Sequence, residues 1–414
     1  TQEYPSIRPT LDLNFAATKT LDRRITFTRD GVGSYIDENG ILKYASNNTP
    51  RFDHDPVTGE SLGLLIEESR TNILYGTPSQ SYTVNTYNLY NSLTGEYNAT
   101  RLAKNASGNN QSHGSWNWNG NLSTTSFVMS VFVKKINHAS FFMQVVSSGV
   151  GDNLYVYYNI DTGVTSFTDY SSPGNLTVTR SIENYPDGWF RLIARVEGFS
   201  NAALHSGFRF GFAHPSNNSQ QYQDSSDEVL VFGAQAEVGN FATSYIPTHE
   251  SATSVTRGVD TAIIKGTNFT DFYNASESTI FFESGVPPVT NSKYFTFHGS
   301  DGGGTELIEA AAVSGPGANI FTYANSTVWS NISVTDASAT TLKYAAGIKA
   351  NDINLAVNGT LGTTDTSSQQ PDALDKLIIG NYSSGNYYIN TSIKKLSYYN
   401  KRLPNAQLQG LTYQ

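Results

Sequence analysis

Short runs in which apolar residues alternate with other residues dominate this chain and constrain its fold more than any other feature. The heaviest stripe is Phe208, Phe210 and Phe212, and similar stripes recur from Phe127 to Val133 and from Phe190 to Val196. Because successive side chains of a strand point to opposite faces, each stripe predicts one buried face of a sheet. Turns rich in Gly, Asn, Pro and Ser separate the runs, with hardly a helical period among them. The sequence therefore predicts an all-β protein of antiparallel sandwiches.

Length and one exit sequence set the expected domain boundaries. The chain has 414 residues, whereas domains commonly hold about 100 to 150 residues and stop growing near about 250 to 300. The run from Val229 to Phe232 is typical of a buried strand, Gly239 ends it, and Pro247 directs an extended path away. We expect an N-terminal hairpin segment over residues 1–75, a jelly-roll-like sandwich over 76–250 and a second sandwich over 251–414.

The N-terminal segment contains apolar strands without enough chain to cover them. Leu11 and Leu13 alternate, and the run from Asp37 to Gly40 predicts a turn between two short strands. These hairpins pack either on the domains that follow or on a neighbouring subunit. Since an uncovered strand edge invites pairing with another chain, we expect a homo-oligomer.

The C-terminal part of the chain has clear turn and helix signals. Asn358-Gly359 predicts a two-residue hairpin turn after the strand that ends at Val357. The last run, from Asn400 onward, predicts one or two helical turns with Leu408 and Leu411 packed inward.

Composition excludes several classes of protein. There are 26 Lys and Arg against 35 Asp and Glu, a formal net charge of -9, and we find no basic stripe, which argues against nucleic-acid binding. Cysteine is absent, so the chain forms no disulfides. No apolar run approaches the roughly 18 to 20 residues that a membrane span needs.

Two tryptophans suggest a sugar-binding platform. Trp116 and Trp118 lie two residues apart in a stretch of small and polar residues, so both indoles share one side if the segment is extended. His113, Asn117 and Asn119 would be their hydrogen-bonding neighbours. The alternative is a strand whose tryptophans are buried in the core.

Two short motifs match, in part, the patterns of a catalytic site and of a metal site. Gly59 to Gly63 matches the Gly-x-Ser-x-Gly pattern of a nucleophile elbow, but a turn sequence precedes it and strand-like residues follow, whereas an elbow needs a strand and then a helix. Asp53-His54-Asp55 is either a metal site or solvated surface. We therefore expect no catalytic residue and no enzyme activity.

Three long strings resemble a recurrent module of tailed-bacteriophage virion proteins, often described as tail fibre or tail structural proteins, and the resemblance covers Leu11 to about Arg257. The strings are ITFTRDGVGSYIDENGIL (Ile25–Leu42), RFDHDPVTGESLGLLIEESRTNIL (Arg51–Leu74) and GAQAEVGNFATSYIPT (Gly233–Thr248). The resemblance implies a location at the surface of an extracellular virus particle, other virion proteins as partners, and a trimer as the oligomer.

Each expected sandwich also resembles a known kind of domain. Residues 76–250 are similar to the carbohydrate-binding-module-like jelly rolls of phage proteins. The part from about Glu277 to the end resembles the concanavalin A-like or laminin-G-like sandwich. Glucanases of that superfamily carry Glu-x-Asp-x-x-Glu on one strand, and this sequence lacks that spacing.

The resemblance of residues 76–250 to jelly rolls suggests a cation site. Asp224, Asp227 and Glu228 precede the last strand of the first sandwich, where related jelly rolls often hold a structural calcium ion. Three acids in a Ser-rich loop are also ordinary turn chemistry. We expect no other cofactor.

These observations support one leading function and one alternative. The leading hypothesis is a phage virion surface protein, a fibre, spike or appendage subunit, that attaches to host-surface polysaccharide. The alternative is a purely structural virion protein, a decoration or tail-assembly component, whose lectin-like folds make protein contacts.

Overall fold

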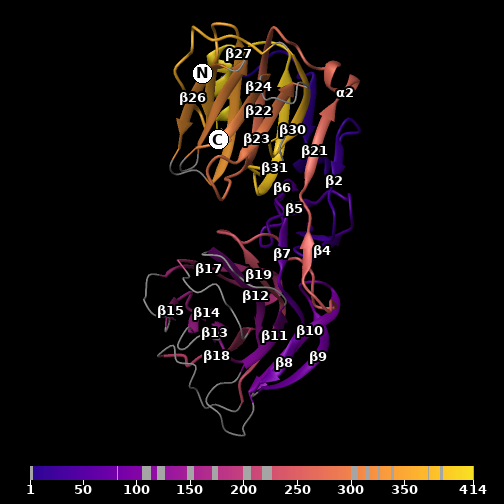
Figure 1. The fold of residues 1–414 in the computed structure, drawn as a ribbon, viewed down its shortest axis with the longest axis vertical. Coiled ribbons are helices and arrows are strands. Elements are labelled where there is room, and N and C mark those ends of the chain that lie inside the picture. The colour runs from indigo at the N-terminus through magenta and orange to yellow at the C-terminus, as the bar shows by residue number, and fades with distance from the viewer. Residues whose placement is uncertain are drawn as a thin grey trace.

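Two antiparallel β-sandwiches lie one above the other along the long axis of the molecule (Figure 1). This is a computed structural model, and it describes residues 3–81, 83–104, 113–118, 126–146, 153–169, 176–198, 207–216, 226–299, 306–313, 317–324, 327–336, 340–371, 373–382 and 386–413. The predicted all-β fold of two sandwiches is confirmed.

The lower lobe in Figure 1 is the first sandwich, built from two facing antiparallel sheets. One sheet has the order β16 (Thr177–Asn184), β17 (Trp189–Glu197), β12 (Ser126–Lys135), β19 (Glu228–Val238), β10 (Glu96–Lys104) and β9 (Thr83–Asn91). The other has the order β15 (Thr165–Asp169), β14 (Asn153–Asn159), β13 (Ser140–Val146), β18 (Gly207–Phe212), β11 (His113–Trp118) and β8 (Leu74–Ser81). A short 3-10 turn, Pro186–Gly188, precedes β17.

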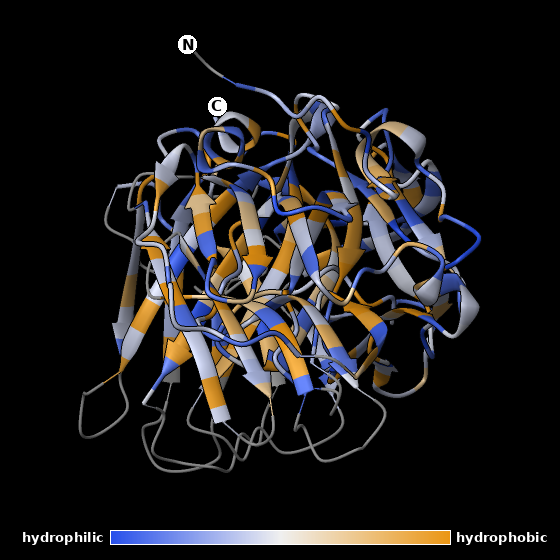
Figure 2. Ribbon diagram, turned by 90° about the horizontal axis from the view of Figure 1, so that it is seen from above, coloured by the Kyte–Doolittle hydropathy of each residue, from blue (hydrophilic) through white to orange (hydrophobic). Residues whose placement is uncertain are grey.

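The predicted stripes form the core of this sandwich. Phe208, Phe210 and Phe212 on β18 pack against the stripe of β12 that begins at Phe127 and ends at Val133. Hydrophobic and hydrophilic residues alternate along the strands when the molecule is seen down its long axis (Figure 2). Each sheet therefore buries one face and leaves the other to solvent or to neighbouring elements.

The upper lobe is the second sandwich. One sheet has the order β29 (Thr360–Leu361), β28 (Asn354–Val357), β27 (Thr341–Lys349), β22 (Glu277–Gly285), β31 (Thr391–Tyr399), β6 (Ser61–Ile66) and β5 (Phe52–His54), and β1 (Leu11–Asn14) also pairs with β31. The facing sheet has the order β2 (Thr26–Thr28), β21 (Thr261–Lys265), β30 (Leu374–Ile379), β23 (Lys293–Gly299), β24 (Glu306–Ala312), β25 (Gly317–Ala324) and β26 (Thr327–Thr335). The helices of this lobe are α1 (Phe15–Thr18), α2 (Thr267–Thr270) and α3 (Asn405–Thr412).

The N-terminal strands complete the second sandwich. Leu13 pairs with Leu396, Phe27 pairs with Ala262, and Leu64 pairs with Ile393. The apolar side chains of β1, β2 and β6 belong to the core of the C-terminal lobe. Residues 1–75, which the sequence suggested as a separate hairpin segment, are thus divided between this lobe and the junction, because the C-terminal sheets offer the open edges that these strands need. The chain leaves the second sandwich, builds the first and returns.

A junction connects the lobes. The strand β7 (Arg70–Asn72) pairs with β20 (Val255–Arg257), and the hairpin of β3 (Gly33–Ile36) and β4 (Leu42–Ala45) packs beside the outer face of β12 and β19. Trp189 is fully buried there, and its indole Nε1–H donates to Ser92 Oγ at 3.1 Å. Trp189 is therefore a structural residue, as its place at the head of a strand indicates.

The predicted C-terminal features are also present. Asn358 and Gly359 have φ of 46° and 81° and connect β28 to β29, as a two-residue hairpin turn requires. In α3, Leu408 is buried and Leu411 packs against the same small apolar cluster.

Candidate functional site

A buried cluster of charges lies at the junction of the lobes. Glu67 accepts hydrogen bonds from Arg51 Nη1 at 2.7 Å, from Ser244 Oγ at 2.6 Å and from the Ser244 amide at 2.8 Å. Arg257 Nη1 approaches the same carboxylate at 2.7 Å. Arg51 also pairs with Asp260. Every one of these five side chains is buried or half-buried, so the cluster is closed to a large ligand.

The electrostatics of this cluster favour the ionised carboxylate. Burial by itself raises the pKa of the Glu67 carboxyl, but the Arg257 and Arg51 guanidinium groups and the Ser244 hydrogen bonds outweigh it and lower that pKa to about 2. Glu67 therefore stays charged at neutral pH and links the two arginines.

The cluster brings together residues of the three long strings singled out in the sequence. Arg51 and Glu67 come from the second string and Ser244 from the third, while Arg29 of the first string pairs with Asp260 at 3.2 Å. Side chains far apart in sequence thus meet at one place. The strings that carry the resemblance build the junction between the lobes, and they also line most of a hollow of about 200 Å³ there.

The two tryptophans proposed as a sugar platform lie on the core side of β11. Trp116 is 6 % exposed and packs against Phe208, with ring centroids 5.6 Å apart. Trp118 is half-buried against the same core cluster. The indoles share one side, as expected, but β11 lies between β8 and β18 and that side faces the opposite sheet. The pair is therefore the buried alternative and offers no open stacking platform.

The proposed hydrogen-bonding neighbours do not surround a site either. His113 is buried, with its ring against Phe142 at a centroid distance of 6.5 Å. Asn117 is exposed on the opposite side of β11 from Trp116 and Trp118. Asn119 lies outside the described residues.

Two of the acids suggested for calcium, Asp227 and Glu228, lie in the described part of the chain and have different partners. Asp227 is buried beside His138, with 3.3 Å between His138 Nδ1 and Asp227 Oδ2. Glu228 lies 3.4 Å from Arg101 Nη1. Among the described residues no group of three or more His, Asp or Glu side chains could hold a metal ion. Asp224 falls outside those residues, and the calcium site stays a prediction.

The Gly-x-Ser-x-Gly motif has a structural explanation. Gly59 ends a turn with φ of 71°, and Ser61 begins the strand β6, so the motif lies between a turn and a strand. Gly63 has φ of 90°, and a Cβ atom there would be 2.0 Å from the carbonyl oxygen of Ile393 on β31. The second glycine is needed because the two strands approach closely.

Asp53, His54 and Asp55 are occupied by backbone contacts. Asp53 accepts from the Ile36 amide at 2.7 Å, and His54 Nδ1 lies 3.0 Å from the Ile36 carbonyl oxygen. Asp55 accepts from the amides of the turn that follows it, at 2.9 and 2.7 Å. Burial raises the pKa of the Asp53 carboxyl to about 6. The three side chains hold the turn and the hairpin in place.

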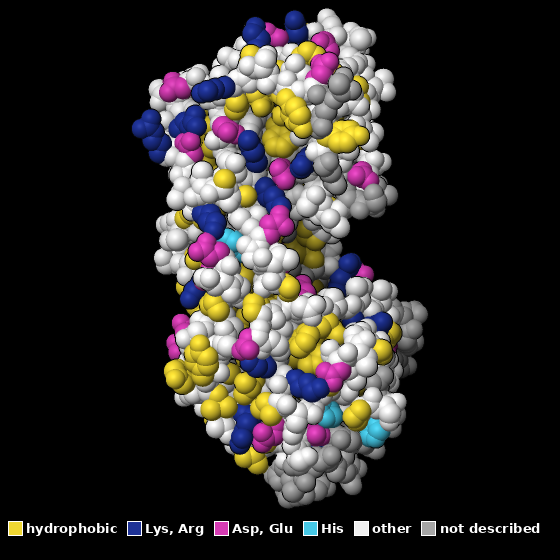
Figure 3. Space-filling model, turned by 180° about the vertical axis from the view of Figure 1, so that it is seen from behind, with side chains coloured by type: hydrophobic (Ala, Val, Ile, Leu, Met, Phe, Trp, Pro, Cys, Tyr) yellow, Lys and Arg dark blue, Asp and Glu magenta, His cyan; other side chains and the backbone are white. Residues whose placement is uncertain are grey.

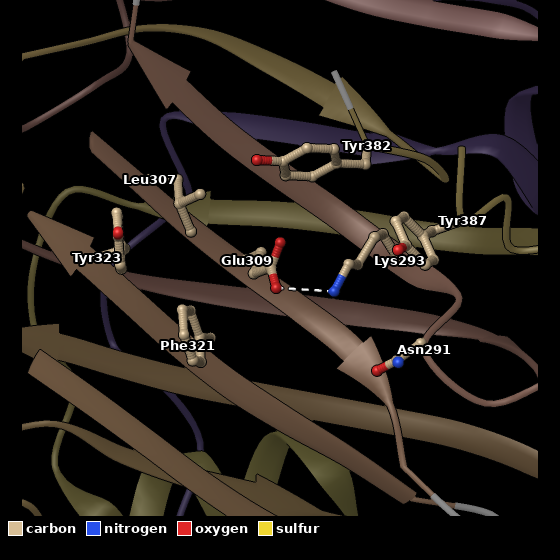
Figure 4. Close-up of a pocket in the computed structure, with 8 residues that line it drawn as sticks. All are labelled: Asn291, Lys293, Leu307, Glu309, Phe321, Tyr323, Tyr382 and Tyr387. Atoms are coloured by element: carbon tan, nitrogen blue, oxygen red, sulfur yellow. Dashed lines mark hydrogen bonds and ion pairs between the residues drawn. The ribbon is translucent and has the colours of Figure 1, made fainter. Parts of the chain in front are cut away.

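An open groove lies on the outer face of the second sandwich, over β23, β24 and β25 (Figure 4). Its volume is about 440 Å³, within the range of small-ligand sites. The residues that line it are Asn291, Lys293, Leu307, Glu309, Phe321, Tyr323, Tyr382 and Tyr387. Strand alternation positions them, because Ile308, Ala310 and Ile320 point into the core and their neighbours point out.

Aromatic rings form the sides of the groove. Phe321 and Tyr323 on β25 are nearly parallel, with centroids 6.3 Å apart and planes at 15°. Across the groove, Tyr382 and Tyr387 meet edge to face at 6.4 Å. Tyr387 is 53 % exposed. Rings on both sides of an open hollow provide apolar surfaces against which a flat ligand can lie.

One ion pair lies at the bottom of the groove. Lys293 Nζ donates to Glu309 Oε1 at 2.7 Å, and the two side chains are 12 % and 11 % exposed. The same ammonium lies 5.5 Å from the centroid of the Tyr387 ring. Asn291 adds an exposed amide at the rim. The groove thus combines aromatic faces with a few hydrogen-bonding groups.

Sequence reasoning did not identify this groove. The available signal was the spacing Phe321-x-Tyr323 beside Leu307-x-Glu309, which predicts two-sided strands. That spacing does not say which face is open.

A smaller hollow of about 200 Å³ lies at the junction, lined by residues of both lobes that include Asp53, Glu67 and Arg191.

On one face of the molecule the exposed charged residues are not gathered into patches. On the face shown in Figure 3, Lys and Arg are interspersed with Asp and Glu, and neutral side chains cover most of the surface. No helix in the described part of the chain has the length and apolar character to cross a membrane.

Comparisons with known proteins concern the fold. No protein-family model matches the chain, and no curated protein sequence matches it either. Solved structures give low TM-scores. The CBM40 domain of the Ruminococcus gnavus IT-sialidase, bound to α2,3-sialyllactose, has 14% identity and a TM-score of 0.28, over 34% of this chain and 84% of that chain.

Two further solved structures span more of this chain. Domains LG4-5 of the mouse laminin α1 chain have 10% identity and a TM-score of 0.27, over 83% of this chain and 92% of that chain. The Trypanosoma rangeli sialidase in complex with the inhibitor DANA has 10% identity and a TM-score of 0.26, over 90% of this chain and 65% of that chain. Likenesses at this level say nothing about what this chain binds.

Proposed function

We propose that the chain is a surface protein of a tailed-bacteriophage particle and that it binds host-surface glycans in the groove over β23, β24 and β25. The observation that carries glycan binding is the groove itself, where parallel aromatic rings lie beside an ion pair. A sugar ring has apolar C–H faces that pack on aromatic rings and hydroxyl groups that exchange hydrogen bonds with Glu309, Lys293 and Asn291.

The proposal that the chain is part of a virus particle has a different basis. It rests on the resemblance of the three strings, from Ile25 to Thr248, to phage virion proteins. Mass spectrometry of particles purified from the source culture tests it. The chain should be found in intact particles and should be accessible there to added antibody. Its absence from purified particles would contradict this part of the proposal.

Glycan binding is tested with a double variant of the groove. Phe321→Ala with Tyr323→Ala removes two half-exposed rings that belong to neither large core. We expect at least a tenfold loss of binding to host-surface polysaccharide and a melting temperature close to that of the unchanged protein. The control is Tyr90→Ala with Tyr97→Ala, a pair of exposed rings 5.6 Å apart on the first sandwich. The control should bind normally.

The results separate this function from its alternative. Binding that survives the groove variant would place the glycan site elsewhere. No binding by the unchanged protein to any host polysaccharide would favour the purely structural virion protein, whose sandwiches make protein contacts. The proposal includes no catalytic step, so incubation should leave the length of the polysaccharide unchanged.

Assembly into a homo-oligomer stays part of the proposal, with a trimer as the form that the phage resemblance implies. The other argument for assembly no longer applies, because β1 and β2 pair within their own chain. The mass of the purified protein in solution is the test.

A further inference from the structure

We infer that the groove selects neutral glycans and discriminates against sugars that carry a carboxylate. This inference rests on the proposed function, since it names the class of glycan that the same groove accepts. It follows from the charges of the groove and from the partners those charges already have.

The groove has no spare positive charge. Among its described lining residues Lys293 is the cation and Glu309 the anion, and 2.7 Å separates Lys293 Nζ from Glu309 Oε1. Lys293 Nζ also faces the Tyr387 ring at 5.5 Å. A carboxylate on the ligand would have to approach this ammonium beside the carboxylate of Glu309. Such juxtaposition of like charges is costly where water is partly excluded.

Neither the net charge of the chain nor movement of the ion pair offsets this repulsion. The whole chain has a formal net charge of -9, so its long-range field does not attract anions. Both members of the ion pair are nearly nine-tenths buried, so neither can swing far from the other to receive a new charge.

Neutral hydroxyl groups can form hydrogen bonds with both members of the ion pair. A hydroxyl can donate to Glu309 and accept from Lys293 without breaking their contact, because a carboxylate has several lone pairs and an ammonium three protons. Phe321 and Tyr323 lie one strand away from Glu309 and offer parallel faces to the same ring. A neutral hexose can therefore satisfy the ion pair and the aromatic side together.

The test uses paired probes that differ in one group. Gluco-, galacto- and manno-configured trisaccharides are titrated by calorimetry beside analogues whose terminal C6 is oxidised to a carboxylate. We expect at least one neutral probe to bind and its acidic analogue to bind at least tenfold more weakly. Binding of the neutral probe should change little between low and high salt, because no net charge is exchanged.

A charge variant sharpens the result. Glu309→Gln releases Lys293 from its anionic partner while keeping the side-chain size. We expect this variant to gain at least tenfold in its preference for the acidic probe over the neutral one. Lys293→Met is the matched variant, and it should bind the acidic probe more weakly still. Melting temperatures check that both variants fold.

The outcomes separate the claim that the groove binds glycans from the claim that it selects neutral ones. Equal or tighter binding of acidic probes that is lost in the Phe321→Ala, Tyr323→Ala variant would overturn the selectivity and leave glycan binding in place. No binding of either probe class would remove the proposed function and the inference with it. An unchanged preference in Glu309→Gln would show that the ion pair does not set the selectivity.

Discussion

Glu67 links several side chains at the junction between the lobes. It bridges Arg51 and Arg257 and accepts two hydrogen bonds from Ser244. A buried carboxylate with this many donors is stabilising only while it is ionised, because removing one partner leaves the others uncompensated. The junction should therefore respond to acid.

The first prediction concerns this acid response. The pKa of Glu67 is lowered from 4.5 to about 2 in the folded protein. Its contribution to the free energy of unfolding, about 3 kcal/mol, is thus fully present above pH 4.5 and is lost as pH falls toward 2. Urea denaturation of the unchanged protein and of Glu67→Gln should show a smaller loss between pH 5 and 3 in the variant. The variant should also be less stable at pH 7 by about 3 to 5 kcal/mol.

Two other acids help to interpret that experiment. Glu38 is an exposed acid whose pKa is lowered by its hydrogen bond with Lys19. Because solvent screens an exposed pair, Glu38→Gln should change the pH profile much less than Glu67→Gln does. Asp53 has a pKa raised from 3.8 to about 6, so its protonation favours the folded state as pH falls from 6 toward 3.8, an effect opposite in sign to that of Glu67. The charge of Glu67 is one cause of that raised pKa, so Glu67→Gln should also lower the pKa of Asp53 and shift its contribution. Parallel profiles for the unchanged protein and Glu67→Gln would refute the prediction.

At the scale of elements, the contact between β6 and β31 leaves no room for a side chain at Gly63. Both strands belong to the same sheet of the second sandwich, and β6 comes from the N-terminal part of the chain. Gly63 permits their approach because the carbonyl oxygen of Ile393 occupies the space that a Cβ atom would take.

The second prediction tests this contact. Gly63→Ala adds a methyl group 2.0 Å from the Ile393 carbonyl oxygen at a residue with φ of 90°. We expect a loss of more than about 2 kcal/mol in the free energy of unfolding. Ser61→Ala is the matched variant in the same motif. The Ser61 hydroxyl is buried without a hydrogen-bond partner among the described residues, so its removal should cost no more than about 0.5 kcal/mol. Equal losses in both variants would contradict this explanation of the motif.

At the scale of the whole molecule, the second sandwich is built from both ends of the chain. Strands β1, β2 and β6 pair with β31 and β21, while the first sandwich lies between them in sequence. An exposed loop at residues 250–254 connects the first sandwich to β20. Cutting this loop therefore does not separate two independent domains.

The third prediction follows from that topology. A cleavage site for a specific protease, inserted after Ala252, should be cut in the folded protein because the loop is exposed. The two fragments should still elute together in size-exclusion chromatography and separate only in denaturant. Fragments that separate under native conditions would show that each sandwich is complete without the other part of the chain.

Local sequence patterns were enough to predict much of the fold. Apolar alternation from Phe127 to Val133 and from Phe208 to Phe212 predicted core strands, because the period of a strand is a local property. Asn358-Gly359 predicted its hairpin turn, because left-handed φ values favour those two residues. The C-terminal helix with Leu408 inward follows from an equally local signal.

Only the tertiary structure decided which strands share a sheet and which faces are open. Trp116 and Trp118 lie on one side of β11 by sequence alone, but the opposite sheet makes that side the core. Phe321 and Tyr323 have the same two-residue spacing, and their side is the open groove. Alternation reports that a strand has two faces, whereas burial depends on what packs against each face from distant parts of the chain. For the same reason, the pairing of Leu13 with Leu396 could not be predicted from either end of the sequence.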